Sequence, residues 1–505
     1  MSERINLTPV NALLSSVAIR RVSCCVILGC VYGITALGCR STQPSSCPPP
    51  SVPTVVQCFA SESVSTTACP CEFQLPPSVI LTDSVNEDEA ITVALANNAA
   101  FRAALMQGGI ATGDVIQSRL LTNPQFHTFI PVGVKEWEWT LFVPLETFLL
   151  RPRRVEAAER DYQRVANTLM QTGLNFVRDV RLAYTDLALA TAQADLANET
   201  VSLRQNIAEL TQRRLERGEI SELEATTARI DALNAQAAAG IAQLNIPVAS
   251  ARLAALMGLP ASMELARADL LTPPLLTTLD NEDLIARALV NRPDMRAAEW
   301  AVASSAQRAE LSRWLFWRVD AAVDANQKGQ KGFEIGPGLR LDFPIFNRNQ
   351  GGIARAQAEL MQARYNRDAI RDQIVQEVRT AATQLKQAEQ NLAIVREQIV
   401  PALREATAVS ERALESGGAS YLLVLQTSSD YIAARTRELD QIAALRRAFA
   451  ELERSVAGKI DPNSDAWNHE LPSPVPPAEE IAHPDSSNGA ESEGLPAARH
   501  LPLLD

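Results

Sequence analysis

The stretch RRLERGEISEL at residues 213–223 returns as RALESGGASYL at residues 412–422. Arginine, leucine, glycine, serine and leucine keep their places in the two copies, and each matched pair lies 199 residues apart. Glycine ends a helix readily and serine caps the start of the next one. Each copy therefore predicts a tight turn between two helices, and the long spacing indicates a duplicated chain.

Two other short sequence motifs also occur twice, in the same order in each half of the chain. Val143-Pro144-Leu145 corresponds to Phe343-Pro344-Ile345 at a spacing of 200, and Ala94-Leu95-x-Asn97 corresponds to Ala288-Leu289-x-Asn291 at a spacing of 194. The spacings differ slightly, which small insertions explain. We therefore predict two structural halves, residues 84–260 and 279–458.

The composition favours long helices. Aromatic residues are only 5% of the 505 residues, while Ala, Leu, Gln, Arg and Glu are abundant in the middle of the chain. The net charge is -12 and the pI is near 5.1. No basic stripe exists to displace phosphate counterions, which argues against a nucleic-acid partner and leaves cations as possible cargo.

The N-terminus has the pattern of an export signal over residues 1–38. Arg20-Arg21 precedes an apolar run, Val22 to Leu37, that is short for a membrane span. Its ending, Ala36-Leu37-Gly38-Cys39, resembles a bacterial lipobox, which implies that Cys39 is lipidated and becomes the mature N-terminus. The alternative is an uncleaved apolar anchor.

All eight cysteines precede residue 72. Cys47, Cys58, Cys69 and Cys71 would remain after cleavage, in a Ser/Pro/Thr-rich linker over residues 39–83. An oxidising compartment favours two disulfides of unassigned pairing. Zinc or copper binding is the alternative, although Cys69-x-Cys71 lacks the usual zinc spacing. Residues 461–505 are rich in Pro, Ser and Glu and are predicted to be disordered; their histidines are irregularly spaced and predict no metal site.

Hydrophobic periods predict the elements of each half. Period-two alternation predicts two strands within about 124–146 and two more within about 314–346. Gln327 to Gly332 is the predicted hairpin turn of the second pair. Helical patterns cover about 86–120, 153–216 and 350–415, with a kink expected at Pro401. Return helices run to about Gly258 and Gly458, so that helical hairpins occupy 150–257 and 350–457. Each long helix would extend about 100 Å at about 1.5 Å per residue.

Four strands cannot close a barrel. Open strand edges in lipid would leave backbone groups unpaired at several kcal/mol each. Several copies of the chain must therefore contribute strands to one barrel, and the long helices must continue it as a tube.

The double repeat, the strand-end residues Pro144 and Pro344, the phrase Ala288-Leu289-x-Asn291-Arg292-Pro293-Asp294 and the Gly-x2-Ser turns resemble the TolC-type outer membrane efflux family over residues 84–458. The resemblance implies a mainly α fold with a small β part: a homotrimer in which four strands per chain form one twelve-stranded transmembrane β-barrel, above an α-barrel tunnel of antiparallel helical hairpins in the periplasm. It further implies an exit duct for an inner-membrane pump, joined through a periplasmic adaptor.

The same resemblance assigns the helix turns as an adaptor-contact tip. The corresponding residues are Arg213, Leu215, Gly218, Ser221 and Leu223 with Arg412, Leu414, Gly417, Ser420 and Leu422. Family members often carry pore-constricting acids beyond the second serine, where this chain has Leu423 and Gln426. Glu222 and Glu224 are the alternative candidates for a constricting ring. Each of these residues has a plain structural alternative, as a helix cap or a solvated surface group.

Aromatic and basic residues accompany the strands. Trp137, Trp139, Trp314 and Trp317 lie near them, where an interfacial belt that contacts outer membrane lipid is expected. Arg151, Arg153 and Arg154 follow Pro144 and are candidates for headgroup contact. Packing and solvation are the simpler alternatives.

Nothing in the repeats predicts an enzyme or a cofactor. The repeats contain one histidine, His127, no cysteine, no nucleophile elbow and no phosphate-binding glycine loop. The remaining alternatives are a coiled-coil scaffold lipoprotein without a pore, and a duct for type I protein secretion rather than for small toxic compounds or metal ions. The four alternating strands argue against the scaffold.

Overall fold

The computed structural model describes residues 73, 75, 85–129, 137–260, 268–270, 272, 280–327, 333–416, 418 and 420–459. All of them belong to one compact unit, Ser51–Asp505. The predicted signal peptide, the lipidation candidate Cys39, the linker cysteines, the hairpin turn after Gln327, the tip residue Gly417 and the C-terminal tail lie outside the described residues.

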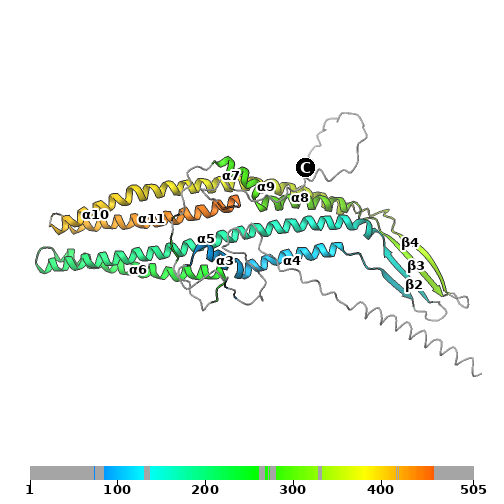
Figure 1. The fold of residues 1–505 in the computed structure, drawn as a ribbon, viewed down its shortest axis with the longest axis horizontal. Helices are drawn as coiled ribbons and strands as arrows, with labels where there is room; N and C mark the ends of the chain where they lie inside the picture. Colours follow the sequence, from blue (N-terminus) through cyan, green and yellow to red (C-terminus); the bar gives the residue numbers. More distant parts are fainter. Residues whose placement is uncertain are drawn as a thin grey trace, which may run out of the picture. The chain divides into compact units, whose positions relative to one another are not determined.

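The two halves have the same order of elements (Figure 1). The first half consists of α3 (Glu87–Asn97), α4 (Ala99–Arg119), β1 (Gln125–Phe129), β2 (Glu138–Pro144), α5 (Glu146–Glu216) and α6 (Glu222–Met257). The second consists of α7 (Asn281–Asn291), α8 (Pro293–Ser312), β3 (Val319–Gln327), β4 (Phe333–Leu341), α9 (Gln350–Ile394), a π-helical turn (Val395–Ile399), α10 (Val400–Glu415) and α11 (Tyr421–Val456). The prediction of a mainly α chain with four strands is confirmed.

Several predicted boundaries were wrong, each for a local reason. The first helical stretch divides at Asn98, whose side chain caps α4 by accepting from Phe101 N at 2.8 Å. Helix α5 begins at Glu146 rather than Arg153 and continues through Pro152. The strand predicted from Leu315 begins only at Val319, because α8 is followed by a turn in which Trp317 N donates to Trp314 O at 3.2 Å.

The strands form one antiparallel sheet in the order β1-β2-β3-β4. Trp139 pairs with Ala325 and Leu141 with Val323 across β2 and β3, while Ala321 pairs with Leu339 across β3 and β4. Neighbouring positions alternate between faces, so these residues share one apolar face. The outer strands β1 and β4 each leave one edge without a partner within the described sheet.

The helices pack side by side in the same sequence as the strands. Near the sheet, α5 packs between α4 and α8, and α8 packs on α9. Toward the turns, α5 packs between α6 and α11, and α11 packs on α10. The two halves therefore join along α5 with α8 and α11, and α4, α6, α9 and α10 lie at the two sides.

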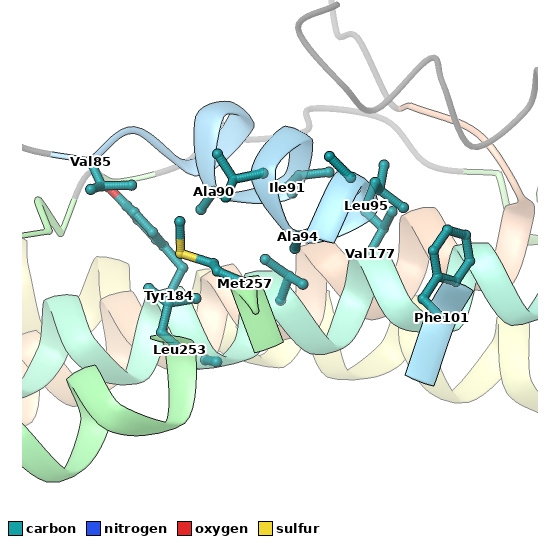
Figure 2. Packing of buried hydrophobic residues seen from close by; sticks show 14 of the residues in the cluster. Val85, Ala90, Ile91, Ala94, Leu95, Phe101, Val177, Tyr184, Leu253 and Met257 are labelled. Carbon is teal, nitrogen blue, oxygen red and sulfur yellow. The ribbon is translucent and has the colours of Figure 1, made fainter. Parts of the chain in front are cut away.

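Each half buries a short helix against its own hairpin. Helix α3 inserts Ile91 and Leu95 against Val177, Leu253 and Met257 of α5 and α6 (Figure 2). Helix α7 does the same in the second half, against α9 and α11. The residue after each short helix reaches the return helix: Asn98 Nδ2 donates to Leu256 O at 3.0 Å, and Arg292 Nη1 donates to Ser455 O at 3.4 Å.

The kink expected at Pro401 coincides with a change of helix type. The π-helical turn Val395–Ile399 lies directly before α10, and Pro401 lies in the first turn of α10. Proline has no N–H to donate and its ring displaces the carbonyl one turn earlier. A wider turn accommodates both defects without ending the helix.

Candidate functional site at the helical turns and the sheet

The first turn has the geometry that its glycine and serine predict. Gly218 has φ 72, a left-handed conformation that favours glycine. Its N–H donates to Leu215 O at 2.8 Å, and Glu219 N donates to Arg214 O at 2.9 Å, which closes the end of α5. Gly218 thus reverses the chain, as expected.

Ser221 and Glu224 form a capping box at the start of α6. Ser221 Oγ accepts from Glu224 N at 3.3 Å, and Glu224 Oε2 accepts from Ser221 N at 3.1 Å. Glu224 therefore has a local partner. Glu222 lies in the same first turn and is exposed. The sequence had suggested either a constricting ring or solvated surface groups for these glutamates, and the capping pattern Ser-x-x-Glu at 221–224 is the signal that would have assigned Glu224 to the helix start.

The second turn is built differently. Ser420 is the first residue before α11, but its side chain makes no capping bond, because Leu423 N donates to the Ser420 carbonyl at 3.2 Å instead. Residue 423 is also a leucine, which cannot return a bond as Glu224 does. The expectation that the Ser420 hydroxyl caps the helix is therefore not met.

The predicted tip residues divide into exposed and buried groups. Leu223 is 76% exposed and Leu422 is 68% exposed, and Gly218, Ser221, Ser420, Arg213 and Arg412 are also exposed. Leu215 is half-buried. Leu414 is only 6% exposed and packs with Ile207, Ala228, Tyr421 and Val424. The assignment of Leu414 to a contact surface is corrected: its side chain holds the two hairpins together.

Polar contacts also link the two hairpins close to the turns. Tyr421 Oη donates to Asp231 Oδ2 at 2.9 Å, and Arg204 donates to Ser428 Oγ at 3.0 Å and Ser429 Oγ at 2.8 Å. Burial raises the pKa of Tyr421, and the hydrogen bond to the Asp231 carboxylate raises it further. Tyr421 thus stays protonated and donates. No local sequence signal predicts these contacts, since the partners are 190 residues or more apart.

The sheet has one polar and one apolar face, as the alternation predicted. Thr140 pairs with Asp324, and Asp320 pairs with Arg340. Thr140 Oγ1 donates to Asp324 Oδ1 at 2.8 Å. The polar face carries five charged side chains: Glu138, Asp320, Asp324, Glu334 and Arg340.

The four predicted belt tryptophans have different positions. Trp139 lies in β2 on the apolar face, and Trp137 precedes β2 and donates to Thr128 Oγ1 at 3.1 Å. Trp314 and Trp317 lie before β3, in the turn that follows α8. They are 48% and 49% exposed.

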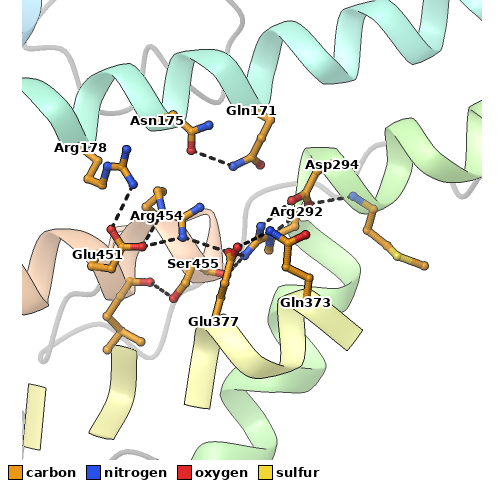
Figure 3. A network of polar contacts seen from close by, with 12 residues as sticks. Gln171, Asn175, Arg178, Arg292, Asp294, Gln373, Glu377, Glu451, Arg454 and Ser455 are labelled. Atoms are coloured by element: carbon orange, nitrogen blue, oxygen red, sulfur yellow. Dashed lines mark hydrogen bonds and ion pairs between the residues drawn. The ribbon is translucent and has the colours of Figure 1, made fainter. Parts of the chain in front are cut away.

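A network of charges centred on the buried Arg292 joins the helices of the second half (Figure 3). Arg292, which is 1% exposed, donates through Nη1 to Glu377 Oε2 at 2.7 Å and through Nε to Asp294 Oδ1 at 3.0 Å. Arg454 Nη2 donates to the same Glu377 oxygen at 2.9 Å. The sequence marked Arg292 and Asp294 as a motif without assigning them a role; the structure shows that they tie α8 to α9 and α11.

The ionisation of Glu377 follows from these partners. Burial by itself raises the pKa of this carboxyl, but hydrogen bonds from Arg292 and Gln373 and the charges of Arg292 and Arg454 outweigh it. Together they lower the pKa of Glu377 to about 2. Glu377 is therefore ionised at neutral pH.

No helix within the described ranges is long and apolar enough to cross a bilayer. The same residues include no group of three His, Cys, Asp or Glu side chains placed to hold a metal ion.

Comparison with known proteins identifies the family. A family model described as outer membrane efflux protein matches residues 90–259 and 284–458, which together are most of the chain. The chain belongs to the outer membrane efflux protein family. The resemblance inferred from the repeated turns is thereby confirmed, and the location is the outer membrane.

Two relatives are resistance proteins. The cobalt-zinc-cadmium resistance protein CzcC of Cupriavidus metallidurans is 25% identical over 73% of this chain and 88% of its own length. The nickel-cobalt-cadmium resistance protein NccC of Alcaligenes xylosoxydans xylosoxydans is 25% identical over 60% of this chain and 70% of its own. The toluene efflux pump outer membrane protein TtgF of Pseudomonas putida is 28% identical over 42% of this chain and 46% of its own.

Solved structures share the fold of this efflux protein. CusC matches with a TM-score of 0.65 and 19% identity over 79% of this chain and 99% of its own. The MtrE outer membrane channel of Neisseria gonorrhoeae, in an open state, matches with a TM-score of 0.60 and 18% identity over 80% of this chain and 98% of its own. The family and its structural neighbours are channels rather than enzymes.

Proposed function

We propose that three copies of this efflux protein form one channel that conducts divalent metal cations out of the cell. An inner-membrane pump and a periplasmic adaptor would deliver the cations. One observation carries the proposal. The described sheet has an unpaired strand edge at each side, and the helical part leaves helices open at the same two sides.

The open sides are arranged for ring closure. In the sheet, β1 lies at one edge and β4 at the other. In the helical part, α4 and α6 lie at the side of the first half, and α9 and α10 at the side of the second. Two different edges that pair from copy to copy make a heterologous interface, which closes into a ring when the rotation allows it. Closure also removes the unpaired strand edges.

The side formed by α6 exposes an apolar seam. The exposed side chains follow helical spacing along α6 and include large aliphatic groups: Ile230, Leu233, Ile241, Leu244 and Val248. A contiguous apolar stripe on a soluble helix marks an interface, because its burial gains about 25 cal/mol per Å². We assign this stripe to the contact with the next copy.

The cargo is inferred from charge and from the relatives. The polar face of the sheet carries four carboxylates and one guanidinium, and the chain as a whole has a net charge of -12. Acidic linings favour cations. CzcC and NccC are cobalt-zinc-cadmium and nickel-cobalt-cadmium resistance proteins. Organic compounds are the second candidate, because TtgF belongs to a toluene efflux pump.

The adaptor would contact the exposed part of the helix turns. Leu223 and Leu422 present exposed leucines at equivalent places in the two turns, and Arg213 and Arg412 are exposed cations in the last turns of the preceding helices. Exposed apolar side chains with neighbouring charges are suited to a protein partner. Lipidation of Cys39 would anchor the chain, and the mass of the mature N-terminal peptide tests it.

One pair of variants tests the trimer assembly, with a substitution at the helix turn as the control. We expect Leu244→Asp, on the α6 seam, to yield monomers in detergent, whereas Leu422→Asp at the turn should remain trimeric. Multi-angle light scattering measures the mass, and planar bilayers measure conductance. A wild-type protein that is monomeric in detergent and gives no conductance would overturn the proposal.

The adaptor contact is tested separately in cells. Photocrosslinking from position 422 should capture a periplasmic adaptor, and from position 210, on the α5 surface, it should capture much less. Equal capture from both positions would show that the turns are not the contact surface.

A further inference from the structure

A pocket of about 370 Å³ lies at the corner between the sheet and the helices. Its walls are mostly apolar: Leu149 and Leu150 from the start of α5, Trp314 and Trp317 from the turn after α8, and Val319 at the start of β3. Its one basic wall residue is Arg153. The proposed transport function does not use this pocket.

Arg153 is held in place without a carboxylate partner. Its guanidinium carbon lies 5.1 Å from the centre of the Trp314 ring, a cation–π contact that fixes its position. Glu146 also lines the pocket, but its Oε2 accepts from Val319 N at 3.3 Å. No carboxylate within the described ranges forms an ion pair with Arg153. The pocket therefore combines an apolar surface with an arginine that makes no ion pair within those ranges and with a glutamate whose Oε2 is engaged by a backbone N–H.

The pocket lies on the apolar face of the sheet. Val319 alternates in β3 with Asp320 and shares its face with Ala321 and Val323. In the proposed ring this face is turned toward lipid, because the opposite face carries the charges. Phe148 and Leu315, next to the pocket, are each 52% exposed and extend the apolar surface.

A neighbouring copy would not cover this position. The pocket is built by β3 and by the beginning of α5, which continues from β2, and Leu145 N donates to Val319 O at 2.8 Å between them. Both β2 and β3 are central strands, while the ring contacts are at β1 and β4. The pocket thus stays open to the bilayer in the assembled channel.

We propose that the pocket binds one phospholipid of the surrounding bilayer, a site that rests on the proposed membrane channel. The phosphate lies against Arg153, and the upper part of an acyl chain lies along Leu149, Leu150 and Trp317. Charge complementarity selects the phosphate, since arginine binds phosphate oxygens with two donors at once. Tryptophan prefers the depth at which headgroups meet hydrocarbon. The site would fix the depth of the strands in the bilayer.

The test uses dioleoylphosphatidylglycerol as the probe and the trimer in detergent. Native mass spectrometry measures how many lipids each trimer retains as the lipid concentration rises. We expect Arg153→Gln to weaken retention by about tenfold, as loss of a charge-assisted hydrogen bond does, and Arg153→Lys to keep part of it. Dioleoylglycerol, which has the same chains and no phosphate, should bind to the wild type about as weakly as the phospholipid binds to Arg153→Gln.

Two controls make the result decisive. Arg252→Gln removes an exposed arginine of α6, and Trp139→Leu removes an aromatic group on the same face of the sheet; both should retain the lipid. Equal retention in Arg153→Gln and wild type, or an equal loss in Arg252→Gln, would overturn the site. Bilayer conductance of the same preparations separates the two proposals, because a failed lipid site leaves conductance intact.

Discussion

Gly258 and Ala457 occupy equivalent places in the two halves, 199 residues apart, and both end a return helix with left-handed backbone. Their φ values are 66 and 57. A Cβ on Gly258 would lie 2.7 Å from Asn97 O and 2.9 Å from Asn97 C, which are backbone atoms that cannot rotate away. The same left-handed turn thus accepts a side chain in one half and excludes it in the other.

We expect Gly258→Ala to destabilise the protein by about 2 kcal/mol or more, through positive φ and the clash with Asn97. Ala457→Gly is the matched control. It relieves about 1 kcal/mol of left-handed strain but loses a buried methyl group worth about 0.8 kcal/mol, so its net effect should be small. Thermal unfolding followed by circular dichroism measures both. Similar stabilities of Gly258→Ala and wild type would contradict the proposed contact with Asn97.

The charge of Glu377 makes stability depend on pH. Its pKa is lowered to about 2 from the ordinary value of 4.5, so its contribution is fully present above pH 4.5 and is lost as the pH falls toward 2. The side chain is 24% exposed. We therefore expect ionised Glu377 to contribute about 2 kcal/mol to the free energy of unfolding, which is less than the full pKa shift would give because the side chain is partly screened by solvent.

Glu377→Gln should lower the melting temperature at pH 7 and flatten its decline between about pH 5 and pH 2. The exposed Glu405→Gln is the control and should follow the wild-type curve. Parallel curves for Glu377→Gln and wild type would show that the network does not depend on this charge.

At the scale of the elements, the two turns differ in how they start the return helix. Ser221 caps α6 through its side chain and Glu224 completes the box, whereas Ser420 makes no side-chain bond. Ser221→Ala should therefore destabilise the first turn by about 1 kcal/mol, and Ser420→Ala should have almost no effect on the second. Hydrogen exchange of the amides at 222–225 and 421–424 measures each turn. Equal protection changes in both turns would contradict the difference in capping.

The sequence predicted those elements whose signals are local. The reversal at Gly218 and the position of Ser221 each follow from the conformational preference of a single residue, and beside Pro401, where a kink was predicted, the structure has a π-helical turn. The alternation along β2 and β4 likewise predicted the faces of the sheet. What it could not predict depends on distant partners: Leu414 is buried by Ile207 and Ala228, Tyr421 bonds Asp231, and Arg292 reaches Glu377.

Boundaries failed where local signals conflict. The helical pattern predicted a start near Arg153, yet α5 begins at Glu146, where Leu145 N donates to Val319 O and fixes the corner. The alternation from Leu315 to Val319 continued the pattern of β3 into a turn. In both places the contact between helix and sheet determines where the element begins. The pattern of hydrophobic residues along the sequence does not report that contact.

At the scale of the whole molecule, duplication explains how one chain provides two unlike edges. Each half supplies two strands and one hairpin, and the halves join through β2 with β3 and through α5 with α8 and α11. The first half leaves β1, α4 and α6 open, and the second leaves β4, α9 and α10 open. Three such chains would close a twelve-stranded barrel with the polar faces inside.

In the proposed barrel the polar faces would determine which ions pass most readily. Each chain contributes Glu138, Asp320, Asp324 and Glu334 against Arg340, so three chains supply twelve carboxylates and three guanidinium groups. A lumen of one predominant sign raises the local concentration of counter-ions. We expect the double substitution Asp320→Asn with Asp324→Asn to lower the permeability ratio of potassium to chloride by about twofold to fivefold.

The same experiment compares the glutamates at the turns with the acidic residues of the barrel as the site that sets the permeability ratio. Glu224→Gln keeps the capping box, because glutamine also accepts from Ser221 N, and so it removes charge without unfolding the turn. Reversal potentials in a potassium chloride gradient across a planar bilayer give the permeability ratio for each variant. If Glu222→Gln and Glu224→Gln lower the ratio more than the pair in β3 does, the constriction lies at the turns and the barrel is a passive exit. If neither set changes it, the acidic faces do not line the pore, and the orientation of the sheet that places them inside must be wrong.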